Sequence, residues 1–164
     1  MSLRRGLILA LACALLAGPA PAAEPAAGAP AATGAAAEPQ EAAAIAAATD
    51  ESDRWLALLA HGKYADSWVA AAVVLQEAIA QKTWVDDLAA RQAKLGRLIM
   101  RERKTASYSK IMRGAPTGDY VTVTYLTKFE KAPLVDETLA VAKDSLGQWH
   151  VAGYDIALDQ AKSP

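Results

Sequence analysis

The feature that most constrains the fold is an abrupt change of composition near residue 49. Residues 1–50 hold 21 of the 40 alanines and no aromatic side chain, whereas all ten Trp, Tyr and Phe residues lie after residue 50. A segment without large apolar groups does not offset the entropy lost on folding. The sequence therefore predicts one folded domain over residues 50–158. Segments that form no hydrophobic core are expected before it, and a short tail at 159–164 after it.

Residues 1–22 have the pattern of a secretory signal peptide. Arg4 and Arg5 precede an apolar run over residues 7–17, which is too short to span a bilayer as a helix. We therefore expect export to the periplasm and no transmembrane segment in the mature form. Cys13 offers a second possibility, a lipoprotein anchor, although Ala10 stands where the lipidation motif usually has Leu.

Residues 23–49 are rich in alanine and proline, and Ile45 is their one large apolar side chain. We expect a disordered linker here. Its last part, residues 41–48, contains neither proline nor glycine and is able to extend the first helix of the domain backwards.

The charge of the domain argues against nucleic acid as a partner. The formal net charge of the chain is −1, and residues 50–164 carry fifteen basic and fifteen acidic side chains. A neutral domain has little electrostatic attraction for a polyanion. The charge is unevenly distributed in one stretch, residues 97–113, which has six basic residues and Glu102 as its one acidic residue. We interpret it as solvated surface, with docking to an acidic partner as the alternative.

Apolar residues change their period partway along the domain. Before Gly96 they recur with helical spacing, as in Trp55 and Leu59. Ser52 is the expected N-cap of the first helix, and Gly62 and Gly96 are expected to end helices. Further helices are expected over residues 63–72, 73–80 and 82–95.

After Thr105 the pattern becomes the alternation of strands. Val121, Val123 and Tyr125 fall on one face of residues 120–130, with threonines between them. Strands are expected over residues 97–112, 120–130, 135–143 and 149–156. The predicted fold class is therefore α+β, with N-terminal helices packed on a curved four-stranded antiparallel sheet.

Several short motifs occur in a familiar order along the domain. They are Gly62-Lys63-Tyr64, Ser67-Trp68, Lys82-Thr83-Trp84, Leu95-Gly96, Pro116-Thr117-Gly118-Asp119-Tyr120-Val121, Phe129, Glu137-Thr138 and Gly147-Gln148-Trp149-His150-Val151-Ala152-Gly153-Tyr154. As a set they resemble the domain-of-unknown-function family 4019, small exported proteins of proteobacteria. The resemblance covers residues 53–156 and implies export and a fold, but no catalytic residues. The order of elements is also similar to the NTF2-like or cystatin-like superfamily, which is an analogy of fold alone.

The common catalytic and metal-binding motifs do not occur in the sequence. His61 and His150 lie in different predicted elements, and nothing marks a third zinc ligand. We therefore expect no metal, no cofactor and no enzymatic activity. Tyr125 with Asp155 is the pair that would suit the alternative, a small NTF2-like hydrolase or isomerase.

Glu137 is the acidic residue most clearly placed by the strand pattern. It falls on the inward face of its strand, where we expect a structural ion pair with Arg101 or Arg103. The neighbouring Asp136 points to the opposite face, so the two carboxylates do not act together.

The aromatic residues provide the candidate ligand site. Trp55, Trp68, Trp84 and Trp149 are expected mainly in the core, since each indole buries a large apolar area. A sharper hypothesis places Tyr64, Trp68, Tyr125 and Tyr154 around a half-open pocket for an apolar ligand.

Together these observations predict a non-catalytic envelope module that binds a small apolar ligand or a periplasmic protein. A structural or assembly protein that pairs through its sheet edge is a further alternative. A hollow cleft between helices and sheet favours the binding module, whereas a filled one with an exposed apolar patch favours assembly.

Overall fold

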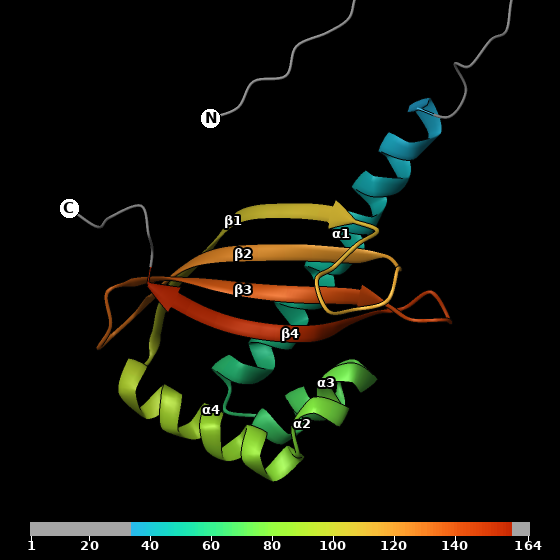
Figure 1. Ribbon diagram of the computed structural model, residues 1–164. Helices are drawn as coiled ribbons and strands as arrows, with labels where there is room; N and C mark the ends of the chain where they lie inside the picture. Colours follow the sequence, from blue (N-terminus) through green and yellow to red (C-terminus); the bar gives the residue numbers. More distant parts are fainter. Residues whose placement is uncertain (1–33, 159–164) are drawn as a thin grey trace, which may run out of the picture. The chain divides into compact units, whose positions relative to one another are not determined.

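The computed structural model describes residues 34–158. The expected signal peptide at residues 1–22 and tail at 159–164 lie outside the described residues. Helices are followed by strands, as predicted for an α+β fold (Figure 1). The elements are α1 (Gly34–Ala60), α2 (Tyr64–Val69), α3 (Val73–Ala78), α4 (Gln81–Leu95), β1 (Leu98–Ser109), β2 (Tyr120–Phe129), β3 (Leu134–Lys143) and β4 (Trp149–Leu158).

Helix α1 begins well before the expected domain boundary. It is continuous from Gly34 to Ala60, so residues 34–49 are helical and differ from the disordered linker expected at 23–49. Alanine has the highest helix propensity of the amino acids. Tertiary packing fixes the helix, because Ala48 and Thr49 are buried in the domain. The folded domain therefore includes a segment whose composition alone indicated a linker.

Ser52 does not cap a helix, contrary to our expectation. It lies fully buried inside α1, where its hydroxyl donates to the carbonyl oxygen of Ala48 at 2.9 Å. The two expected helix ends are present. Gly62 and Gly96 follow α1 and α4 with φ of 70° and 77°, a region that glycine adopts without steric cost.

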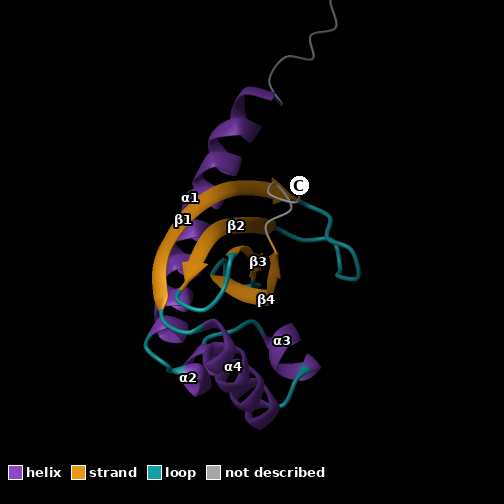
Figure 2. Ribbon diagram, turned by 90° about the vertical axis from the view of Figure 1, so that its left-hand side faces the viewer, coloured by secondary structure: helices purple, strands orange, loops and turns teal. Residues whose placement is uncertain are grey.

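The strands form an antiparallel meander in the order β1-β2-β3-β4, as predicted. Val121 and Val123 in β2 are fully buried, whereas the intervening threonines are partly exposed. Helix α1 contacts all four strands on the buried face. Register shifts interrupt the β1–β2 pairing at two places and the β3–β4 pairing at one. Such irregularities bend strands, and the sheet is strongly curved (Figure 2).

Two of the four tryptophans form the centre of the core. Trp55 and Trp84 are buried, with ring centroids 5.9 Å apart, and Ser67 satisfies both indole N–H groups. Trp68 and Trp149 are partly buried and pack against the margin of the core. Of the four tryptophans expected mainly in the core, two therefore lie inside it and two at its margin.

The buried part of α1 gives a test of this fold. We expect Ala48→Gln to destabilise the domain by about 2–4 kcal/mol, because it overpacks a filled site and buries an amide. Ala46→Gln is the matched control on the exposed side of the same helix and is expected to change stability by less than about 0.5 kcal/mol. Urea denaturation measures both. Equal stability of the two variants would show that residues 41–49 do not pack on the domain.

Candidate functional site

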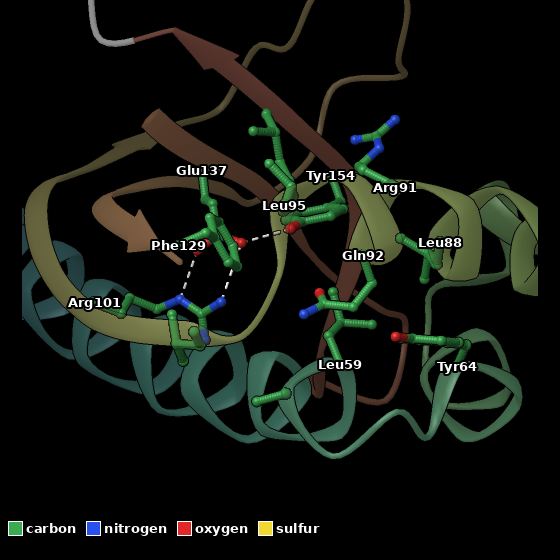
Figure 3. Close-up of a pocket in the computed structure, with 13 residues that line it drawn as sticks. Leu59, Tyr64, Leu88, Arg91, Gln92, Leu95, Arg101, Phe129, Glu137 and Tyr154 are labelled. Carbon is green, nitrogen blue, oxygen red and sulfur yellow. Dashed lines mark hydrogen bonds and ion pairs between the residues drawn. The ribbon is translucent and has the colours of Figure 1, made fainter. Parts of the chain in front are cut away.

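The carboxylate of Glu137 connects all four strands. Glu137 is fully buried on the inward face of β3. Arg101 of β1 donates to it from Nε at 2.6 Å and from Nη2 at 3.1 Å. Thr127 of β2 and Tyr154 of β4 each donate a hydroxyl at 2.5 Å. Figure 3 shows Glu137 between Arg101 and Tyr154.

These contacts leave the carboxylate saturated. Burying a charge is costly unless it is paired and hydrogen-bonded, and two oxygens offer about four acceptor positions. Four donors occupy them here. Burial raises the pKa of Tyr154, and the charge and hydrogen bond of Glu137 raise it further, so this phenol remains a donor. The cluster is therefore built to hold the sheet together and has no free lone pair with which to accept a proton from a substrate.

The space beside this cluster is small. A cavity of about 20 Å³ lies between the sheet and helices α1 and α4, lined by Tyr64, Arg101, Glu137 and Tyr154 together with apolar side chains. A volume of that size holds about one water molecule. The cleft between helices and sheet is thus nearly filled, and neither an apolar ligand nor a substrate fits in it.

The four aromatic residues expected to share a pocket are not all together. Tyr64 and Tyr154 line the small cavity. The indole of Trp68 instead donates to the carbonyl oxygen of Ile79 at 2.9 Å. The hydroxyl of Tyr125 donates to Asp53 of α1 at 2.6 Å. Polar atoms of buried and partly buried rings need hydrogen-bond partners, and these two rings find them in separate places.

The remaining sequence candidates are also separated. Arg103 faces Tyr125 in the strand register and is exposed, and of the two arginines considered it is Arg101 that pairs with Glu137. Asp155 is exposed and lies opposite Thr138, so it does not join Tyr125. His61 is exposed at the end of α1.

His150 of β4 lies 3.4 Å from Asp144, which is in the connection between β3 and β4. Residues 34–158 contain no group of three or more His, Cys, Asp or Glu side chains placed to hold a metal ion.

A much larger opening lies at the end of the sheet where β1 and β3 finish. This groove has a volume of about 680 Å³, within the range of small-molecule sites. The N-terminal half of α1 forms one wall, and the ends of all four strands form the other. The α1 wall consists of Gln40, Glu41, Ala43, Ala44 and Ala47, and the sheet wall of Tyr108, Lys110, Asp119, Lys143, Gly147 and Trp149.

The sheet wall of the groove is ordered by its own contacts. Asp119 accepts hydrogen bonds from the hydroxyl of Tyr108 and the ammonium of Lys110. These bonds, that of Lys110 first, lower the pKa of Asp119. Lys110 lies over the ring of Tyr108 at 5.7 Å, and Lys143 over the ring of Trp149 at 5.9 Å.

Sequence reasoning missed this groove. One wall comes from the part of α1 that lies within the expected linker at residues 23–49, and the other from residues beside four strand ends that share no motif. The one available signal was the predicted meander itself, because its first and third loops lie at the same end of the sheet.

The family described as proteins of unknown function, DUF4019, matches residues 51–154. The chain belongs to this family. The expected resemblance is thus confirmed, whereas similarity to the NTF2-like superfamily stays a prediction. No curated protein and no solved structure matches the chain. The DUF4019 match includes Glu137 and its three partners, and the α1 wall of the groove precedes it.

The Glu137 cluster predicts a large and specific loss of stability. Glu137→Gln leaves the guanidinium of Arg101 without its counter-charge, and we expect a cost of about 3–5 kcal/mol in urea denaturation. Asp136→Asn is the matched control, because its partner Lys104 lies 3.0 Å away at the surface and such pairs contribute about 0–1 kcal/mol. A Glu137→Gln domain as stable as the control would contradict the structural role.

The two buried phenols predict a loss of stability in alkali. Burial, followed by the acidic partners Glu137 and Asp53, raises the pKa of Tyr154 and of Tyr125 above the usual value. Stability from these groups is complete below about pH 10, where an unfolded tyrosine ionises, and falls as the pH rises further. The urea midpoint should fall as the pH is raised from roughly 9 to 11. Tyr154→Phe should make this fall of the midpoint with pH less steep. A slope that Tyr154→Phe leaves unchanged would be evidence against this account.

Proposed function

We propose that this protein is a non-catalytic binding module of the cell envelope and that its ligand lies in the groove between α1 and the sheet end. One observation carries the proposal: the groove measures about 680 Å³, whereas the cavity between helices and sheet measures about 20 Å³. A ligand of organic size therefore has room only outside the packed core.

The lining of the groove supports binding rather than catalysis. Its described residues include no His, Cys or Ser, Asp119 is engaged with Tyr108 and Lys110, and the other carboxylate, Glu41, lies on the opposite wall. The lining therefore brings no nucleophile together with a general base. Aromatic, alanine and lysine side chains suit recognition of a ligand through contact and charge.

Assembly is the second candidate, and an exposed apolar patch favours it. Val69, Val73 and Val74, at the corner between α2 and α3, have exposed fractions of 64%, 66% and 54%. Size-exclusion chromatography with light scattering tests this role. Self-association that Val73→Ser abolishes would favour assembly over ligand binding.

Export is the part of the proposal that rests on residues 1–22. Among residues 34–158, none of the helices combines the length and hydropathy needed to cross a membrane. We expect the mature chain to begin near Ala23, and intact-mass measurement on a periplasmic extract checks this. A diacylglycerol mass on Cys13 would instead identify a lipoprotein.

Filling the groove tests the binding site. In a nuclear magnetic resonance screen of small organic fragments, we expect binders to shift the indole signal of Trp149. Ala44→Trp should abolish binding because it occupies the groove, whereas Ala90→Trp, on the exposed face of α4, should leave binding unchanged. Thermal melting of both variants controls for folding. Fragments that bind the Ala44→Trp variant as they bind the unaltered chain would show that the site lies elsewhere.

A further inference from the structure

The sheet wall of the groove carries a row of charged and aromatic side chains. Lys110 follows β1, Asp119 precedes β2, Lys143 ends β3 and Trp149 begins β4. The backbone N–H of Lys143 donates to the carbonyl oxygen of Asp119 at 3.0 Å, which fixes two members of the row side by side. These residues therefore form one continuous surface across the end of the sheet.

Hydrogen-bond donors outnumber free acceptors along this row. An ammonium has three N–H donors, and a carboxylate has none. The Asp119 carboxylate already accepts from Tyr108 and Lys110. Lys110 keeps two donors beyond that bond. Lys143 lies over the Trp149 ring at 5.9 Å, and its positive charge also lowers the pKa of Asp119. Two lysines against one carboxylate leave the row with a net charge of +1.

The opposite wall limits the charge of a ligand. Glu41 lies there on α1 and is exposed, so the lining as a whole holds two lysines and two acidic residues. A second carboxylate disfavours a polyanion, because like charges repel at short range. The positive charge of the lining is therefore confined to the sheet wall, where it suits a ligand with one negative charge.

The rest of the groove offers apolar contact. Ala43, Ala44 and Ala47 line the α1 side, and the rings of Tyr108 and Trp149 line the sheet side. Small methyl groups facing aromatic rings leave space for an apolar body of flat or extended shape.

We infer that the groove binds an organic monoanion, with its acid group held by Lys110 and Lys143 and its apolar body against the alanines of α1. The inference rests on the proposed function, since it names the class of ligand for the same site. It differs in site and in ligand charge from the apolar ligand that the sequence analysis placed in a half-open pocket.

Two fluorescent probes of the same ring system separate charge from shape. 8-Anilinonaphthalene-1-sulfonate is an organic monoanion, and N-phenyl-1-naphthylamine is its uncharged counterpart. We expect the full mature chain to bind the sulfonate saturably and the amine at least about tenfold more weakly, since a charge-assisted hydrogen bond is stronger than a neutral one.

Lysine variants assign the effect to the groove. Lys143→Met keeps an unbranched side chain and removes the charge, and we expect it to raise the Kd of the sulfonate about tenfold without affecting the amine. Lys94→Met, at an exposed position of α4 outside the groove, is the matched control and should change neither. Melting temperatures confirm that both variants fold.

Different results would overturn different claims. Equal affinity for the two probes, unchanged in Lys143→Met but lost in Ala44→Trp, would keep the groove as a site and reject the anion. Probe binding that Ala44→Trp leaves intact would reject the groove and with it the proposed function. Absence of saturable sulfonate binding to the unaltered chain would also reject the anion.

A last arm distinguishes a soluble anion from an anionic lipid headgroup. Vesicles of phosphatidylglycerol are sedimented with the unaltered chain and with Lys143→Met. Co-sedimentation lost in Lys143→Met would support a lipid as the source of the anion. Sulfonate binding without co-sedimentation would support a soluble organic acid. Co-sedimentation that Lys143→Met does not alter, together with unaltered sulfonate binding, would contradict the inference.

Discussion

The buried carboxylate of Glu137 is the interaction on which the sheet depends. It takes hydrogen bonds from Arg101, Thr127 and Tyr154, so each of the other strands contributes a donor to one group. A shift of β3 by one residue would move Glu137 to the outer face and leave Arg101 without its partner. The polar cluster therefore specifies the register of strands whose other inward residues are mostly interchangeable valines and leucines.

The same cluster determines where a ligand has room. Because Glu137 and its partners occupy the helix-facing side of the sheet, together with the Trp55 and Trp84 indoles, the interior is nearly closed. Space remains where the cluster and the core end, at the edge bounded by Lys110, Asp119 and Lys143. The Glu137 cluster and the groove of the proposed binding site thus lie at different ends of one sheet.

Much of the fold was predictable from the sequence, because residues alternate along β3 and along β2 from Val121 onward, and burial follows the alternation. That pattern also placed Glu137 inward, with Arg101 or Arg103 as the expected partner. The helical extension was foreseen only for residues 41–48 and not for residues 34–40, since alanine suits both a linker and a helix until something packs against it. The groove and the Tyr125–Asp53 contact depend on residues distant in sequence, so no local sequence pattern predicts them.

The register shifts in β1 have a consequence for pairing between chains. An unpaired edge strand is a ready template for the backbone of another chain, and β1 is an edge of 12 residues. Register shifts interrupt its pairing with β2 at two places, and Arg103 and Lys104 add charge at the second. At the other edge, the N–H of Ala72 caps the carbonyl of Val151 at 2.9 Å. Both borders of the sheet are thereby less suited to pairing with the edge of another chain.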